Sequence, residues 1–167
     1  MKLSDYVIQY IGAEMGVKHL FLIVGGANMH LVDSCAKTSA LQYICVQHEQ
    51  AGAIAGEAYA RITNGLGAVL VTSGPGGTNA LTGLGCAWMD SIPCLFISGQ
   101  VSSKDYTDGS TIRQLGVQQI NIVEIVKSLT KYAAVVHDPS SIRMHLDKAR
   151  HFALEGRPGP EIGRAHV

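Results

Sequence analysis

Glu49 is the residue whose type and position best suit acid–base chemistry in this sequence. It follows an apolar run at residues 41–46, which is typical of a strand, and it opens a run of small residues at 49–61, which is typical of a helix. In open α/β sheets, ligands bind at this end of a strand. Because Ala53 and Gly56 follow on the same helical face, a flat ligand could approach closely. Glu49 could exchange a proton with such a ligand; alternatively, it only stabilises the helix dipole.

Two glycine-rich turns, at residues 25–28 and 73–77, also follow apolar runs of strand length. Neither turn fits the Gly-x-x-x-x-Gly-Lys-Ser/Thr or Gly-x-Gly-x-x-Gly patterns that bind phosphates. They either let backbone approach a ligand closely or are ordinary tight turns. Since the carboxyl ends of parallel strands meet at one edge of a sheet, we expect both turns to lie near Glu49.

Polar residues around these turns could serve a ligand or only the local structure. His48 lies at the strand–helix junction, where a hydrogen-bonding role is expected and a direct acid–base role is the alternative. Thr72, Asn79, Gln100 and Gln118 are all residue types that are common in turns and helix caps.

Apolar runs and segments of helical periodicity alternate along the chain. Strands are predicted at residues 19–24, 41–46, 67–72, 93–98 and 132–136. Helices are predicted at residues 4–15, 29–37, 49–61, 78–90, 120–127 and from 139 onward. We expect Ser4 to cap the first helix, Gly16 to end it in the left-handed conformation and Asp138 to cap the last helix.

This order predicts a doubly wound α/β domain with a mainly parallel sheet and helices on both faces. The polar segment at residues 99–116 is predicted to be a long loop, and loops of that length inside compact domains are usually functional or mobile.

Composition favours a globular domain without an affinity for polyanions. The chain has 167 residues, 47% of them apolar, and its net charge is zero, so neither nucleic acid nor a membrane surface is an expected partner. The four cysteines lack metal-site spacing, so no metal site is expected in this chain. Without a signal peptide or an apolar run of about 20 residues, the protein is expected in the cytoplasm.

The last residues do not continue the pattern. Gly156–Pro160 should introduce another strand, yet residues 161–167 show neither strand alternation nor helix signals and resemble a translated sequencing adapter. We therefore expect a domain at residues 1–160 that lacks its final strand, and a non-native tail at residues 161–167.

Five motifs in order give the chain a resemblance to one enzyme family over about residues 1–160. The motifs lie at residues 48–61, 71–79, 90–93, 98–101 and 156–160. The chain resembles the N-terminal pyrimidine-binding domain of thiamine diphosphate enzymes, and specifically that of the acetolactate synthase large subunit.

The resemblance implies decarboxylation and carboligation of a 2-keto acid. Glu49 would be the catalytic residue, hydrogen-bonded to a ring nitrogen of the cofactor aminopyrimidine. The other positions that match cofactor-binding residues of the family are Gly25, Gly26, Thr72, Pro75, Asn79 and Gln118. The resemblance also implies a role in branched-chain amino acid biosynthesis.

The resemblance further implies that this chain supplies half of a site. In the family, Mg²⁺ and the diphosphate are held by a Gly-Asp-Gly…Asn motif on another subunit of a homodimer or homotetramer, and some members bind FAD; the motif is absent here. The Tyr-Pro of acetolactate synthases is replaced by Ile23-Val24, and the loop before Gln118 is longer. A lyase or decarboxylase of surface-sugar metabolism, a split subunit and a non-catalytic module are therefore alternatives.

Overall fold

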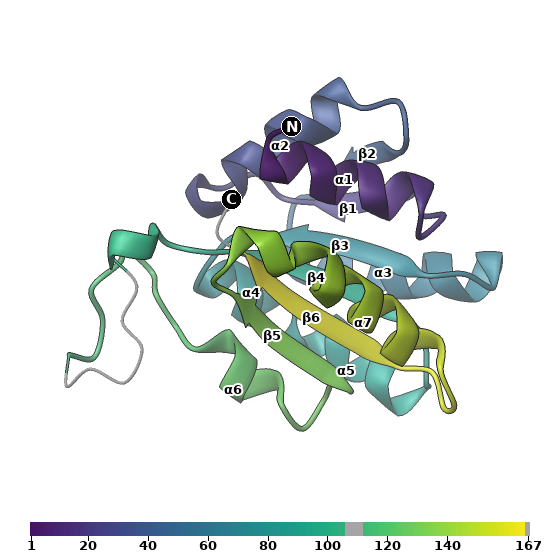
Figure 1. Cartoon of the computed structure of the whole chain (residues 1–167). Coiled ribbons are helices and arrows are strands. Elements are labelled where there is room, and N and C mark those ends of the chain that lie inside the picture. Colours follow the sequence, from purple (N-terminus) through teal and green to yellow (C-terminus); the bar gives the residue numbers. More distant parts are fainter. Residues whose placement is uncertain (106–111, 166–167) are drawn as a thin grey trace.

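The computed structural model describes residues 1–105 and 112–165. The described strands form one sheet in the order β2-β1-β3-β4-β6-β5, and all neighbouring pairs are parallel (Figure 1). Their bounds are β1 (His19–Leu22), β2 (Gln42–Cys45), β3 (Gly67–Val71), β4 (Cys94–Gly99), β5 (Tyr132–Val136) and β6 (Pro160–Ala165). The predicted doubly wound, mainly parallel α/β fold is confirmed.

Helices cover both faces of the sheet (Figure 1). Their bounds are α1 (Leu3–Ala13), α2 (Met29–Lys37), α3 (Glu49–Thr63), α4 (Pro75–Asn79), α5 (Leu81–Met89), α6 (Ile122–Val126) and α7 (Ile142–Leu154). Three short 3-10 turns are η1 (Gly26–Asn28), η2 (Ser103–Asp105) and η3 (Pro139–Ser141). One hydrophobic core lies between the sheet and helices α1, α2 and α7. A second core lies on the opposite face of the sheet, under helices α3, α5 and α6. Within the described ranges, no helix is long and apolar enough to cross a membrane.

The chain reverses direction across the sheet beside β1. It passes from β1 outward to the edge strand β2 and returns to β3 on the other side of β1. Such a switch point leaves a crevice at the carboxyl ends of the strands, because the loops on its two sides diverge. The segments after β1, β2 and β3 carry the predicted site residues except Gln118, which lies in the loop after β4.

The expectation of a missing final strand is wrong for the described residues. Residues 160–165 form β6, which pairs with β4 on one side and β5 on the other. Ladder hydrogen bonds on both sides and the burial of Ile162 stabilise this strand although its sequence lacks strand alternation. Residues 166 and 167 of the predicted tail lie outside the described part, as do residues 106–111 of the predicted long loop.

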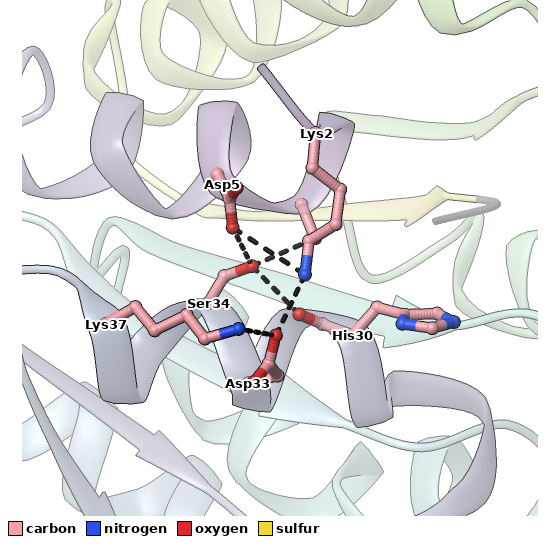
Figure 2. A network of polar contacts seen from close by, with 7 residues as sticks. Lys2, Asp5, His30, Asp33, Ser34 and Lys37 are labelled. Atoms are coloured by element: carbon pink, nitrogen blue, oxygen red, sulfur yellow. Dashed lines mark hydrogen bonds and ion pairs between the residues drawn. The ribbon is translucent and has the colours of Figure 1, made fainter.

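Ser4 does not cap the first helix as expected. Lys2 occupies the N-cap position, and Ser4 lies buried within α1, where its hydroxyl accepts a hydrogen bond from Ser34 of α2 at 2.9 Å. Figure 2 shows this contact network between α1 and α2, in which Ser34 also contacts Asp5 at 2.6 Å. Tertiary contact with α2 thus decides the role of Ser4.

The helix expected at residues 78–90 begins earlier and has a break. Pro75 starts α4 at the first helical position, where its missing N–H costs nothing, and α5 follows after Ala80. The expected left-handed conformation of Gly16 is confirmed, with φ of +74°. Asp138 caps the 3-10 turn η3 that leads into the last helix, where its carboxylate accepts from the Ser140 N–H at 2.9 Å, and Ser141 occupies the N-cap position of α7.

Candidate functional site

Glu49 is the first residue of α3 and lies beyond the carboxyl end of β2. Its side chain is partly buried, and its Oε2 accepts a hydrogen bond from Asn79 Nδ2 at 3.0 Å. Its other oxygen, Oε1, lies beside Gly76, where an added Cβ would be 3.4 Å away. The structure therefore brings the predicted residues Glu49 and Asn79 together, although 30 positions separate them in the sequence.

Thr72 connects the turns that follow β1 and β3. Its Oγ1 accepts a hydrogen bond from the Ala27 N–H at 3.3 Å. A Cβ at Gly25 would lie 2.5 Å from Thr72 Cβ, and a Cβ at Gly76 would lie 2.7 Å from Thr72 Cγ2. Since real Cβ atoms do not approach so closely, both positions require glycine, and the two turns are in direct contact.

Gln118 reaches the same edge of the sheet from the loop before α6. It adopts a left-handed backbone conformation with φ of +56°, which is uncommon for a residue other than glycine. A Cβ at Gly74, itself at φ of +61°, would lie 2.3 Å from the Gln118 carbonyl oxygen. Strained residues of this kind gather at functional sites, because the surrounding contacts must hold them in place.

A pocket of about 340 Å³ lies among these loops. Four predicted site residues line it, namely Gly25, Gly26, Thr72 and Gln118. The pocket is not lined by Glu49, Pro75 or Asn79, which form a neighbouring group. Gly76 connects this group to the pocket, because it lies beside both Glu49 and the pocket residue Thr72.

Sequence reasoning did not place the residues directly after β4 in the site. Gln100, Val101, Ser102 and Asp105 belong to the pocket wall. In the sequence, Gln100 could serve a ligand or only the local structure, and it was not among the predicted site residues. The signal that could have identified it is its position directly after a predicted strand, at the same edge as the glycine turns.

His48 has a structural role in this arrangement. It is the N-cap of α3, and its Nδ1 accepts a hydrogen bond from the Gln50 N–H at 3.1 Å. That bond satisfies one of the free backbone donors at the start of the helix and fixes the position of the residue that follows. The expected hydrogen-bonding role is thus confirmed.

A larger pocket lies away from the candidate site. It measures about 470 Å³ and is lined by Trp88, Lys131 and Arg157, close to the amino ends of β5 and β6. All three donors of Lys131 are used by backbone carbonyls of Phe152, Glu155 and Arg157. We therefore regard it as a surface hollow and place the site at the carboxyl ends of the strands.

The described residues around the site suit an uncharged, hydrogen-bonding ring. None of the described residues that line the 340 Å³ pocket is a lysine or arginine, and amide and hydroxyl groups together with the Asp105 carboxylate supply its polarity. The space that glycines leave beside Thr72 and Glu49 admits a flat group, and a partly buried carboxylate can share a proton with a ring nitrogen. The Asn79 bond holds that carboxylate in position.

The sequence matches a family described as thiamine pyrophosphate enzyme, N-terminal TPP binding domain, over residues 1–125. It is 39% identical over 159 residues to the acetolactate synthase large subunit of Buchnera aphidicola subsp. Schizaphis graminum, covering 90% of this chain and 27% of that protein. It is 38% identical over 149 residues to the acetolactate synthase isozyme 3 large subunit of Escherichia coli, covering 89% and 25%.

A protein of Nicotiana tabacum is similar to this chain to nearly the same extent. Acetolactate synthase 2, chloroplastic, of Nicotiana tabacum is 36% identical over 159 residues, which cover 95% of this chain and 23% of that protein. The chain thus spans about a quarter of the length of the curated relatives it matches.

Proposed function

Because the chain belongs to the family of N-terminal TPP binding domains of thiamine pyrophosphate enzymes, we propose that it serves a thiamine diphosphate-dependent enzyme that decarboxylates a 2-keto acid and joins the product to a second carbonyl compound. The similarity to acetolactate synthases from Buchnera aphidicola, Escherichia coli and Nicotiana tabacum favours this reaction.

The observation that carries the proposal is the Glu49–Asn79 pair beside Gly76. Glu49 would share a proton with a ring nitrogen of the aminopyrimidine, while Asn79 keeps the carboxylate from turning away. Gly25, Gly26, Thr72, Pro75 and Gln118 would form the walls around the ring. The cofactor, when bound, supplies the carbanion stabilisation that decarboxylation requires.

The remaining parts of the function extend beyond these residues. The described part of the chain contains no group of three or more His, Cys, Asp or Glu side chains that could hold a metal ion. We propose that a domain of another subunit in a homodimer or homotetramer holds Mg²⁺ and the diphosphate, with FAD as an optional further cofactor. A role in branched-chain amino acid biosynthesis and a cytoplasmic location belong to the same proposal.

Replacing Glu49 with Gln in the full-length protein tests this assignment. The amide cannot share the proton that a carboxylate shares, so we expect the turnover number with pyruvate to fall by roughly 10²- to 10⁴-fold. The circular dichroism spectrum should stay unchanged, because the side chain keeps its shape. Glu14→Gln, at an exposed position after α1, is the matched control and should retain full activity.

The products formed from pyruvate distinguish the reactions. Acetolactate supports the proposed carboligation, while acetaldehyde alone would indicate a decarboxylase. Full activity of the Glu49→Gln protein would contradict the role of this carboxylate. A wild-type protein that binds no thiamine diphosphate would support a non-catalytic module instead.

A further inference from the structure

Gln100 carries a buried amide group that lacks a hydrogen-bond partner. It follows β4 directly, and only 6% of its surface is exposed. Within the described residues, its Nε2 makes no hydrogen bond. Buried donors in folded proteins are nearly always paired, because an unpaired donor loses its bonds to water without replacement. An exception beside a pocket indicates a donor reserved for a ligand.

The orientation of this amide is fixed by its backbone neighbour. Oε1 of Gln100 accepts a hydrogen bond from the Val101 N–H at 2.9 Å. A backbone N–H can only donate, so the oxygen of the carboxamide must face it. The nitrogen, with its two hydrogens, is therefore the free end.

Gln100 lines the 340 Å³ pocket together with residues of the candidate site. A Cβ at Gly99 would lie 2.4 Å from the Ala27 carbonyl oxygen, so the end of β4 is pressed against the turn that follows β1. Gly25 and Gln118 contribute other parts of the same wall. The residue that carries the free donor thus lines the pocket where the proposed cofactor site and its substrate would meet.

The charges around the pocket restrict the acceptor that Gln100 would meet. None of the described lining residues is a lysine or arginine, and Asp105 contributes a carboxylate to the wall. An anionic acceptor would be repelled by Asp105 without a compensating cation. An uncharged carbonyl oxygen or ring nitrogen fits these surroundings better.

We propose that Gln100 is a ligand-binding residue whose Nε2 donates a hydrogen bond to an uncharged acceptor of the bound ligand. This inference rests on the proposed function, which supplies two sources of such an acceptor. One is the aminopyrimidine ring of thiamine diphosphate, and the other is the keto oxygen of the substrate.

Two variants of the full-length protein separate the free donor from the rest of the side chain. Gln100→Glu keeps an oxygen that can accept from the Val101 N–H but has no N–H to donate. Gln100→Met keeps the length of the side chain and loses both functions. Gln9→Met, at an exposed position on α1, is the matched control. The measurements are the dissociation constant of thiamine diphosphate by calorimetry, the KM for pyruvate and the melting temperature without ligand.

We expect both Gln100 variants to weaken one of the two ligands by about 3- to 10-fold, as the loss of one neutral hydrogen bond predicts, while Gln9→Met changes neither. A weaker thiamine diphosphate complex in the absence of substrate places the acceptor on the cofactor. An unchanged cofactor affinity with a raised KM for pyruvate places it on the keto acid.

Other patterns overturn the inference. If only Gln100→Met binds a ligand more weakly, the contact with Val101 is responsible. If only Gln100→Glu binds a ligand more weakly, the added charge is responsible. If both variants bind both ligands like the wild type, Nε2 has no ligand. A wild-type protein that binds no thiamine diphosphate would overturn the proposed function itself, a result that is distinct from all of these.

Discussion

Two glutamates of this fold differ in burial and in hydrogen bonding. Glu49 is partly buried and accepts a hydrogen bond from Asn79. Glu161 is fully buried in β6, and neither of its oxygens has a hydrogen-bond partner among the described residues. Burial raises the pKa of Glu161 to about 8, and the charge of Lys131 offsets this only in part. The first carboxylate is held in position by a hydrogen bond, whereas the second destabilises the strand that contains it.

Glu161 should make the stability of the chain depend on pH. Between pH 4.5 and about 8, the folded protein retains a proton that the unfolded chain releases. Each rise of one pH unit in this window therefore lowers the free energy of unfolding by about 1.4 kcal/mol, and below pH 4.5 the loss disappears. Urea denaturation at a series of pH values measures this slope.

Glu161→Gln should remove the slope, because the amide does not ionise. Glu14→Gln, which alters an exposed glutamate, should leave it as in the wild type. Equal slopes in the wild type and in Glu161→Gln would show that Glu161 is not the group responsible.

At the scale of the elements, periodicity identified most of the fold. The structure has α2 and β5 at the predicted residues, because their apolar positions match the period of the element and their ends carry turn residues. β6 was missed because the buried Glu161 and the partly buried Gly163 are not typical strand residues. Pairing with β4 on one side and β5 on the other stabilises the strand instead. Gly163 in particular leaves open space where a Cβ would point.

The site was predictable in part for a related reason. Glycine turns and a carboxylate after strands can be recognised along the chain, since parallel strands end at one edge. The hydrogen bond between Asn79 and Glu49 and the free end of Gln100 depend on distances between elements, which periodicity does not contain. The Ser4 expectation failed for the same reason, because its partner Ser34 lies on another helix.

The contacts between α1 and α2 give a prediction at this scale (Figure 2). The buried Ser34 hydroxyl lies within hydrogen-bond distance of Ser4, Asp5 and the His30 carbonyl. Removing it deprives the buried Ser4 hydroxyl of this partner, so Ser34→Ala should lower the free energy of unfolding by about 1–3 kcal/mol. The urea midpoint should fall while the m-value stays constant.

Ser39→Ala is the control, since Ser39 is exposed in the loop after α2 and its loss should cost less than about 0.5 kcal/mol. The ion pairs of Lys2 and Lys37 with Asp33 surround this network but are exposed, so they contribute little to stability. If Ser34→Ala and Ser39→Ala have equal stability, the buried network does not hold the helices together.

At the scale of the whole molecule, the domain offers a ligand only a partial enclosure. The loops after β1, β3 and β4 meet at one edge of the sheet and form a pocket that is open to solvent. The described wall contains amides, hydroxyls and one carboxylate, and none of its members is a lysine or arginine. Such a wall can bind the ring of thiamine diphosphate, but it provides no counter-charge for the diphosphate, which requires cationic groups or Mg²⁺.

The chain by itself should therefore bind thiamine and thiamine diphosphate about equally and weakly. We expect dissociation constants on the order of 1 mM for both, within about threefold of each other, because the ring supplies nearly all the contacts. The full-length protein should prefer the diphosphate by at least about 100-fold, since charge-assisted bonds then add to the ring contacts. Calorimetry with the two ligands, after circular dichroism has shown that the chain is folded, measures the difference. Glu49→Gln in the chain should weaken both ligands to the same extent, because it acts on the ring alone. Micromolar binding of thiamine diphosphate by the chain, or a clear preference over thiamine, would show that the diphosphate site lies within these residues.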